Sequence, residues 1–412
     1  MMSKITIYPS NVRGSVKISG SKNSALAIIA ASCVVGRKIK LENVPDISDV
    51  FNMIRLLEKI GCKVNYKKDK LSIINDCKNI SLRLDETKKI RASYYFMSVY
   101  LALFKEVSIY LPGGCDIGSR PINFHLEGFK KAGCVVEIEN DSVKVSAKEL
   151  KPFEYTLPKK SMGATVNLMI LASKIQGKSI IKNASTEPEI DDLISFINCG
   201  DSYAFRDNDD IVIYGSESIK EKVKYRIMSD RIEAFTFMCI GTNSKKLVIK
   251  NINLNHLKSP LKCLKDIGAK YKIRKKDIVF YKSKLKSTTV FSNHYPSLST
   301  DQMPLLYPLL IRASGLSVCK EEIFESRFKV CEELLKVGAD IDIQKDIIFI
   351  NGNNNLVGCD LYASDLRAAA CLLVEAIFNG NSTVHNLHYL ERGYSQIYKK
   401  LKKIKIKYKL VF

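Results

Sequence analysis

Apolar and polar positions along the chain repeat in a fixed order. A helical pattern of apolar residues ends at a glycine, and an alternating, strand-like segment follows. The pattern occurs as RLLEKIGCKV, EGFKKAGCVVEI, LISFINCGDSYA, KCLKDIGAKYKI and ELLKVGADIDI, and a sixth copy, YKKLKKIKIKYKL, lacks the glycine. The glycines are Gly61, Gly133, Gly200, Gly268 and Gly338, so consecutive copies are separated by 72, 67, 68 and 70 residues. Each glycine is predicted to follow a helix in a left-handed conformation, before the strand begins.

A second marker recurs in step with the first. It is a short β-prone segment that begins about 25 residues before each glycine. The six segments span residues 36–44, 106–114, 177–185, 245–253, 315–324 and 381–390. Together the two markers predict a unit of about 70 residues of mixed helix and strand, used six times, with three units in each of two domains.

Length and composition agree with two folded domains. A chain of 412 residues is too long for one ordinary core. The opening MMSKITIYPS has no apolar segment typical of a secretory signal, and the apolar stretch 25–35 is too short to cross a bilayer. The twelve cysteines include no C-x-x-C pair, which argues against zinc and against a disulfide framework. A reducing cytoplasm is therefore expected, with most thiols acting as small apolar groups.

The formal net charge of +22 allows two interpretations. One is a surface for nucleic acid or membrane. The other is a lysine-rich chain with charges scattered over solvated faces. The basic residues form no single block with interleaved aromatics, so the second interpretation is favoured and no nucleic-acid partner is expected.

The stretch LPGGCDIGSRP, residues 111–121, is the first candidate for chemistry. It places Cys115 in a glycine-rich loop, five residues before Arg120. Such a loop can present a catalytic thiol beside a phosphate-binding arginine. It can equally be a turn that contains a cysteine, because Gly-Gly marks turns and free cysteines are common in proteins.

Further motifs decide between these readings. They are SGSKNSAL (19–26), EPEIDDL (187–193), YRIMSDRIEAFTF (225–237), STDQ (299–302), IFESRF (323–328), ASDLRAAA (363–370) and ERGY (391–394). With the cysteine loop and the six repeats, they make the chain resemble the enolpyruvyl transferases over essentially its whole length. The resemblance implies an α/β fold of two inside-out α/β barrels, with helices inside and sheets outside. Residues 22–229 would form one domain, residues 1–21 with 230–412 the other, and the active site would lie in the cleft between them.

The resemblance also implies an activity. The Lys22-Asn23 pair and the Cys115 loop are similar to the members that transfer the enolpyruvyl group of phosphoenolpyruvate to the 3′-hydroxyl of UDP-N-acetylglucosamine. That reaction proceeds by addition and elimination, releases phosphate, and begins the synthesis of peptidoglycan precursors. Phosphoenolpyruvate and UDP-N-acetylglucosamine are thus the expected partners, with no cofactor and no metal. A monomer or weak homo-oligomer is expected.

Site residues follow from the same resemblance, position by position. Cys115 matches the general acid that delivers a proton to the methylene carbon of phosphoenolpyruvate, and it is the expected target of the epoxide fosfomycin. Lys22, Arg120 and Arg392 match the residues that bind phosphoenolpyruvate. The expected proton acceptor near the sugar's 3′-hydroxyl is Asp301.

Other positions match contacts to the sugar nucleotide. Arg91 corresponds to a further site arginine, and Asn23 and Ile323 correspond to residues that orient the sugar. The expected contacts to uridine and diphosphate are Pro121, Ile122, Asn123, Phe124, Ser161, Met162 and Gly163. Residues 365–367 correspond to a stretch beside the cysteine loop. The five histidines have no spacing typical of a metal site or a triad, and are interpreted as structural or surface residues.

Four departures from the family pattern stand out. Asn123 replaces the usual aspartate, Gln302-Met303-Pro304 follows Asp301 in an altered order, and Phe235 replaces a small residue. The stretch 199–210 has lost its usual glycines. The residues for proton transfer and phosphate binding all remain, which favours a working enzyme.

Three alternatives stay open at this point. The shikimate-pathway enolpyruvyl transferase shares the fold and phosphoenolpyruvate, but it does not need the cysteine loop. A degenerate homologue would keep ligand binding without turnover. A nucleic-acid-binding protein would explain the charge but not the cysteine loop.

Overall fold

A computed structural model of the protein describes residues 3–111, 122–139, 141–352 and 355–411. The chain divides into two compact units, each with its own apolar core. The inserted unit comprises the described residues between Gly20 and Met228, and the terminal unit comprises those before Gly20 and after Met228. The chain changes unit two residues earlier than the sequence predicts at the first crossing, and one residue earlier at the second.

Strands of the described residues form six sheets, three in each unit. Those of the inserted unit are, in spatial order, β13 (Lys220–Arg226), β3 (Gly36–Glu42), β5 (Lys70–Ile74) and β4 (Lys63–Lys67); β6 (Glu106–Tyr110), β8 (Ser142–Ser146) and β7 (Val135–Ile138); and β11 (Tyr203–Asp207), β12 (Asp210–Gly215), β10 (Gly177–Lys182) and β9 (Glu154–Thr156). Those of the terminal unit are β21 (Asp360–Tyr362), β22 (Ser382–His385), β1 (Lys4–Tyr8) and β23 (Lys407–Val411); β15 (Lys270–Arg274), β16 (Asp277–Tyr281), β14 (Lys246–Lys250) and β2 (Arg13–Lys17); and β17 (Thr289–Ser292), β18 (Leu316–Glu321), β20 (Ile347–Asn351) and β19 (Asp340–Gln344). The six β-prone segments of the sequence became β3, β6, β10, β14, β18 and β22, which confirms that marker.

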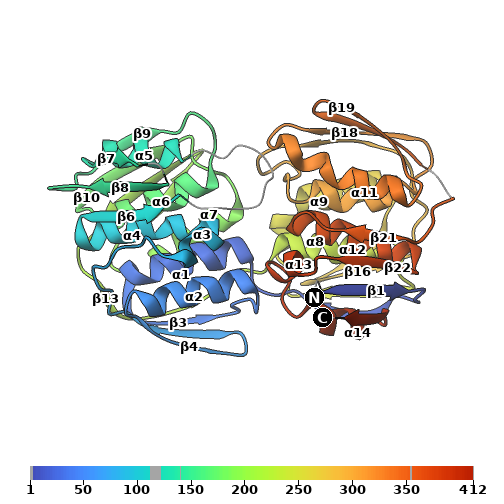
Figure 1. Cartoon of the computed structure of the whole chain (residues 1–412), viewed down its shortest axis with the longest axis horizontal. Helices are drawn as coiled ribbons and strands as arrows, with labels where there is room; N and C mark the ends of the chain where they lie inside the picture. The colour runs from blue at the N-terminus through green and yellow to red at the C-terminus, as the bar shows by residue number, and fades with distance from the viewer. Residues whose placement is uncertain (1–2, 112–121, 140, 353–354, 412) are drawn as a thin grey trace. The chain divides into compact units, whose positions relative to one another are not determined.

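Each repeat contributes one inner helix that is apolar on nearly all sides. The inner helices are α1 (Lys22–Val35), α4 (Tyr95–Phe104) and α6 (Met162–Ala172) in the inserted unit, and α8 (Arg231–Gly241), η3 with α10 (Met303–Leu306 and Tyr307–Leu310) and α12 (Leu366–Asn379) in the terminal unit. Almost every residue of α6, α8 and α12 is buried, as expected for helices without a polar face. Figure 1 shows the helices inside each unit with strands around them, the inside-out arrangement that the family resemblance implies.

The second helix of each repeat is amphipathic and half-buried. These helices are α2 (Ser48–Lys59), α5 (Asn123–Lys131), α7 (Pro188–Ile197), α9 (Lys258–Asp266), α11 (Cys331–Lys336) and α14 (Ile397–Lys403). Short helical turns complete the described chain: α3 (Asp85–Lys89), η1 (Arg91–Tyr94), η2 (Leu254–Leu257), η4 (Glu325–Val330) and α13 (His388–Glu391). In this part of the chain no helix is both long and apolar enough to cross a membrane.

The repeated glycines behave as predicted at all positions but one. Gly61, Gly133, Gly268 and Gly338 have φ angles of 103°, 95°, 91° and 90°, which L-residues rarely adopt. Gly200 does not have a positive φ, so the prediction was wrong there. The following strand starts later in that repeat, and a Cβ on Gly200 would lie 3.0 Å from a methyl group of Val35, so close packing accounts for this glycine.

A repeated asparagine was not predicted. It directly follows the central strand in four repeats, has a positive φ, and donates a side-chain hydrogen bond to a backbone carbonyl beside the neighbouring parallel strand. The asparagines are Asn43, Asn183, Asn251 and Asn386, with acceptors at Ile227, Leu157, Ile18 and Ala363 at 2.7–2.9 Å. Each bond joins the end of a central strand to the end of the neighbouring parallel strand and so fixes both strand ends.

Candidate active site

Lys22 stands at the first position of helix α1. The hydroxyl of Ser21 caps this helix by accepting from the backbone N–H of Ser24 at 3.4 Å. Only glycine fits before this cap, because a Cβ on Gly20 would lie 1.7 Å from the carbonyl oxygen of Asn43. The ammonium group of Lys22 lies 2.6 Å from the carboxylate of Asp49, which is 2% exposed at the start of α2. A helix N-terminus with a positioned ammonium group is a favourable place for an anion. Asn23, the next residue, is half-buried.

Arg91 opens the short helix η1 and is half-buried. Its guanidinium lies 5.8 Å from the centroid of the Tyr94 ring. Burial lowers the pKa of Arg91 from its ordinary value, although the group remains a cation at neutral pH. A guanidinium with reduced hydration binds an anion more strongly than one in open water.

The segment 122–124 leads directly into a buried histidine. Ile122 and Phe124 are half-buried and Asn123 is exposed, whereas the next residue, His125, is buried in helix α5. The amide nitrogen of Asn167 lies 2.7 Å from Nδ1 of His125, and its amide oxygen accepts from the hydroxyl of Ser98 at 2.7 Å. An amide nitrogen can only donate, so Nδ1 accepts and the ring proton is on Nε2.

His125 is held neutral by its surroundings. Burial, and then the charge of Arg91, lower the pKa of His125 to about 3. A Cβ on Gly163 would lie 3.3 Å from Cε1 and Nε2 of the ring, so the 161–163 turn packs against it. Ser161 caps helix α6 by accepting from the N–H of Ala164 at 3.3 Å, and Met162 beside it is half-buried. Thus Arg91, segment 122–124 and turn 161–163 come together around His125.

The terminal unit carries a carboxylate between two arginines. Oδ1 of Asp301 accepts from Arg327 and Oδ2 accepts from Arg367, both at 2.8 Å. The arginine side chains are 2% and 8% exposed, whereas that of Asp301 is 27% exposed. Burial alone would lower the pKa of Arg367, but the charge of Asp301 raises it above its ordinary value. The two cations therefore fix the orientation of a carboxylate that still reaches solvent.

The residues after Asp301 stabilise this turn despite their altered order. Gln302 is fully buried, and its amide oxygen accepts from the backbone N–H and the hydroxyl of Ser299 at 3.3 and 3.1 Å. Pro304 lies in the first turn of η3, where its missing N–H costs nothing. Phe235, another departure, is completely buried in α8.

Ile323 is positioned through its backbone. Its N–H donates to a carboxylate oxygen of Glu321 at 2.9 Å, and the N–H of Phe324 donates to the same oxygen at 3.2 Å. The other oxygen of Glu321 accepts from the hydroxyl of Ser292 at 2.5 Å. Glu321 is buried at the end of β18, so it fixes the loop that presents Ile323.

Arg392 directly follows α13, and the next residue, Gly393, packs against the start of helix α12. A Cβ on Gly393 would lie 2.6 Å from Leu366, which opens helix α12. The hydroxyl of Tyr394 lies 2.7 Å from that of Thr236, and burial raises the pKa of Tyr394. Asp365 caps α12 by accepting from the backbone N–H of Arg367 at 2.7 Å.

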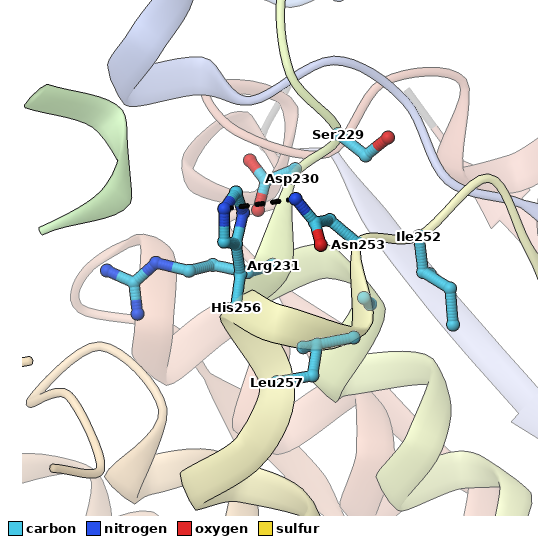
Figure 2. A pocket seen from close by; sticks show the side chains of 8 residues that line it. Ser229, Asp230, Arg231, Ile252, Asn253, His256 and Leu257 are labelled. Atoms are coloured by element: carbon cyan, nitrogen blue, oxygen red, sulfur yellow. Dashed lines mark hydrogen bonds between the residues drawn. The ribbon is translucent and has the colours of Figure 1, made fainter. Parts of the chain in front are cut away.

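A small pocket marks the start of helix α8. It is lined by Ser229, Asp230, Arg231, Ala234, Ile252, Asn253, His256 and Leu257 (Figure 2). Asp230 caps the helix by accepting from the N–H groups of Ile232 and Glu233 at 2.8 and 2.9 Å. The guanidinium of Arg231 lies 5.8 Å from the centroid of the Tyr295 ring. This pocket combines a helix N-terminus with a partly desolvated cation.

Three predicted residues, Cys115, Arg120 and Pro121, lie outside the described residues. The site residues that sequence reasoning missed are His125, Glu321 and Arg327, and Arg367 was noted only as part of a stretch. Arg327 lies within the motif IFESRF (323–328), and His125 directly follows segment 122–124. Their position in or beside a matched motif is the sequence signal that could have drawn attention to them, but it does not reveal their burial.

The family model of EPSP synthase (3-phosphoshikimate 1-carboxyvinyltransferase) matches residues 7–401. The chain belongs to the EPSP synthase family. One relative in the family is a UDP-N-acetylglucosamine 1-carboxyvinyltransferase of Wolbachia from Brugia malayi, 38% identical over 94% of both chains. Others, with the same enzyme name, come from Staphylococcus haemolyticus (36% identical, 95% of both chains) and Thermotoga maritima (36% identical, 99% of both chains).

Solved structures of this family share the fold. The enolpyruvyl transferase NikO from Streptomyces tendae has a TM-score of 0.91 at 21% identity, covering 100% of this chain and 99% of that one. An EPSP synthase from Acinetobacter baumannii has a TM-score of 0.79 at 16% identity, covering 100% of both chains. The two-domain enolpyruvyl transferase fold predicted from the sequence is therefore confirmed.

Proposed function

We propose that the protein transfers the enolpyruvyl group of phosphoenolpyruvate to the 3′-hydroxyl of UDP-N-acetylglucosamine, releasing phosphate. The observation that carries this proposal is the 36–38% identity, over nearly the whole chain, to relatives that bear the name of this enzyme. In an organism with a cell wall this reaction starts the synthesis of peptidoglycan precursors. The arrangement of cations and one carboxylate in the described residues supports the same chemistry.

The proposed reaction is an addition followed by an elimination. Lys22, Arg120 and Arg392 hold the phosphate and carboxylate of phosphoenolpyruvate. Cys115 gives a proton to the methylene carbon while the sugar's 3′-hydroxyl oxygen bonds to the neighbouring carbon, and Asp301 accepts the hydroxyl proton. The Cys115 thiolate then takes a proton back from the new methyl group, the carbon–carbon double bond reforms, phosphate leaves, and Asp301 returns its proton to solvent. Protons and electron pairs balance over the two steps, so no cofactor is needed.

The sugar nucleotide occupies the remaining predicted positions. Segment 122–124 and turn 161–163, which pack around His125, bind the uridine and diphosphate, and Arg91 adds a positive charge near them. The amide of Asn123 is exposed and can hydrogen-bond to uracil, as the usual aspartate would. Asn23 and Ile323 orient the sugar, and Glu321 fixes Ile323.

The compartment and assembly state belong to the same proposal. The cysteines of the described residues are all free thiols, which supports a reducing compartment such as the cytoplasm. We infer a monomer or weak homo-oligomer, because the proposed chemistry draws all its residues from one chain.

Phosphate release from phosphoenolpyruvate tests the function. The purified protein is assayed with UDP-N-acetylglucosamine or with shikimate 3-phosphate as acceptor, with and without fosfomycin. Release that needs the sugar nucleotide, and that is lost in Cys115→Ala and with fosfomycin, is expected. Cys199→Ala, which changes a half-buried thiol elsewhere in the chain, should keep full activity.

Two results would overturn the proposal. Release with shikimate 3-phosphate alone would favour the shikimate-pathway activity. Folded protein that binds UDP-N-acetylglucosamine but releases no phosphate would be a degenerate homologue.

A further inference from the structure

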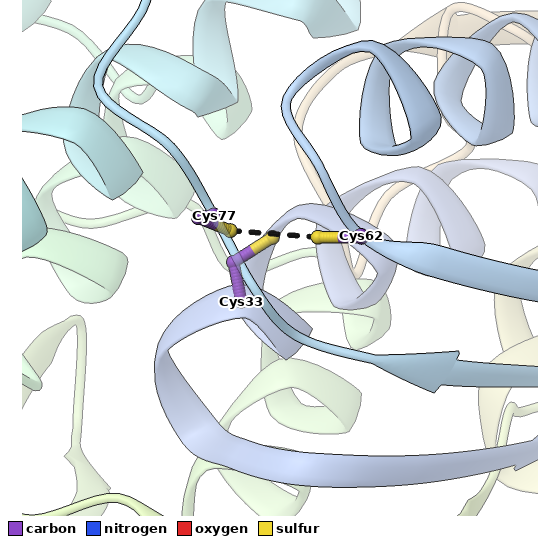
Figure 3. A group of neighbouring side chains, drawn as sticks. All are labelled: Cys33, Cys62 and Cys77. Carbon is purple, nitrogen blue, oxygen red and sulfur yellow. Dashed lines mark hydrogen bonds between the residues drawn. The ribbon is translucent and has the colours of Figure 1, made fainter.

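Three cysteines from distant parts of the first repeat meet in the inserted unit. Cys33 lies in the last turn of α1, Cys62 directly precedes β4, and Cys77 follows β5 (Figure 3). Their sulfur atoms all lie within 4.8 Å of one another, and those of Cys62 and Cys77 are 3.5 Å apart. The sequence indicated only isolated, packed thiols, because spacings of 29 and 15 residues match no metal-binding motif.

The sulfur positions suit a single metal ion. A metal–sulfur distance of about 2.3 Å places two thiolates about 3.8 Å apart in a tetrahedral site and about 4.0 Å apart in a trigonal one. Both values fall between the 3.5 Å contact and the 4.8 Å limit of the cluster. Small side-chain rotations would therefore complete the site.

Electrostatics at this point favour a cation. Cys33 is at the C-terminal end of α1, where the helix dipole is negative. The side-chain amide of Asn75 donates hydrogen bonds to the carbonyl groups of Ser32 and Gly36 at 2.6 and 2.5 Å, which fixes that helix end.

The other repeats show that the fold does not need a third sulfur here. In each of four repeats a backbone N–H after the second hairpin strand donates to a carbonyl at the end of the amphipathic helix, at 2.8–3.0 Å. The residue before this donor is Cys77 in the first repeat, but it is Leu150, Leu285 or Leu356 in the others. Cys62 likewise corresponds to Cys134, Ala269 and Ala339, each directly after the repeated glycine. Packing alone is thus satisfied by leucine against a small residue.

We propose that Cys33, Cys62 and Cys77 bind a thiophilic metal ion, with copper(I) as the preferred occupant. Three thiolates with no histidine or carboxylate in the group suit a soft ion that accepts three ligands. Structural zinc usually takes four protein ligands. Cys33 and Cys62 are buried, whereas the half-buried Cys77 gives a route from solvent. The site is independent of the proposed enolpyruvyl transfer.

Anaerobic titration with copper(I), against a chromophoric chelator, tests the proposal. The full-length Cys115→Ala protein is the parent, because it lacks the predicted reactive thiol of the catalytic loop. One tightly held equivalent is expected. Cys77→Leu, which restores the leucine of the other repeats, should fold and weaken binding by about 100-fold or more, since it removes a direct ligand. Cys134→Ala, which changes the counterpart of Cys62 in the second repeat, should bind as the parent does.

X-ray absorption of the copper-loaded parent gives an answer that needs no variant. Three sulfur neighbours at about 2.3 Å support the site. Fewer sulfurs, or undiminished affinity in Cys77→Leu, would overturn it. Tighter retention of zinc(II) than of copper(I), in the same competition, would overturn the choice of metal. Phosphate release is measured separately, so loss of that activity cannot be mistaken for loss of this site.

Discussion

At the scale of single residues, Asp301 is the carboxylate whose surroundings matter most. It neutralises part of the charge of two buried guanidinium groups, Arg327 and Arg367. In Asp301→Asn the amide cannot neutralise them, and we expect the free energy of unfolding to fall by about 1–3 kcal/mol. If Asp301 also accepts the substrate proton, kcat should fall about 10²–10⁴-fold. Urea unfolding and phosphate release measure the two effects separately.

A matched change on the surface gives the control for Asp301. Glu221 pairs with Lys38 at 2.8 Å, and both side chains are more than half exposed. Glu221→Gln should leave kcat and stability essentially unchanged, because exposed ion pairs contribute little. An Asp301→Asn enzyme with normal kcat would exclude Asp301 as the proton acceptor.

The lowered pKa of His125 predicts that the stability of the protein depends on pH. Its folded-state pKa of about 3 lies below the ordinary value of about 6.5, so the unfolded chain binds the proton more readily. The contribution of neutral His125 is fully present above pH 6.5 and is lost as the pH falls towards 3. Between pH 7 and 5 it should lower the free energy of unfolding by about 2 kcal/mol.

Urea unfolding of wild type and His125→Gln at several pH values checks this. At pH 7 the variant should be less stable than wild type, because the contact with Asn167 is altered. Between pH 7 and 5, however, its free energy of unfolding should fall by about 2 kcal/mol less than that of wild type. Parallel pH curves for the two proteins would show that His125 already titrates normally in the folded state.

The roles of His125, Glu321 and Arg327 could not be assigned from the sequence alone, although Arg327 lies in a matched motif. Each acts through a partner that is remote in sequence or contributed by a backbone N–H: Asn167 for His125, the loop N–H groups for Glu321, and Asp301 for Arg327. The positions that directly match motifs were predicted because the family pattern is local. A motif does not include the residues, distant in the sequence, that hold its side chains in place.

At the scale of elements, the end of the sixth repeat tests the glycine pattern. Lys405 follows α14 with a φ of 66°, where four other repeats have a glycine with positive φ. A non-glycine residue there costs about 1 kcal/mol. We expect Lys405→Gly to raise the free energy of unfolding by about 0.5 kcal/mol, after the larger entropy of the unfolded glycine chain is subtracted.

The reverse change serves as the control for Lys405. In Gly268→Ala the added Cβ would lie 2.8 Å from the carbonyl oxygen of Lys284, with φ at 91°. Both strain and close contact oppose it, so a loss of at least about 1 kcal/mol is expected in thermal unfolding. A Lys405→Gly protein that is clearly less stable than wild type would contradict the account of the helix end.

At the scale of the whole molecule, the repeats made the fold predictable. Six copies of a helix–strand pattern at intervals near 70 residues predict six similar sheets, and the described residues form six. The exceptions are local. Gly200 departs because its strand starts later, and the Cys33, Cys62 and Cys77 cluster was hidden because a hairpin and a helix end bring together residues with no common spacing.

The proposed binding of phosphoenolpyruvate uses the positive charges of Lys22 and Arg392 together. If both cations contact one anion, Lys22→Met and Arg392→Met should each raise the KM for phosphoenolpyruvate about 10–100-fold. Their combined effect should differ from the sum by at least about 0.5 kcal/mol, since residues that share a ligand couple. Steady-state kinetics of the four proteins of this cycle measure the coupling.

A buried lysine remote from the predicted site provides the control that distinguishes weaker substrate binding from lower stability in that cycle. Lys174 donates to the carbonyl groups of Ser216 and Ser218 at 2.7 and 2.6 Å, and burial lowers its pKa to about 8. Lys174→Met should lower stability without changing the KM for phosphoenolpyruvate, because it leaves those two carbonyls without their donor. If Lys22→Met behaved like Lys174→Met, its ion pair with Asp49 would be a structural contact and the anion would have to bind elsewhere.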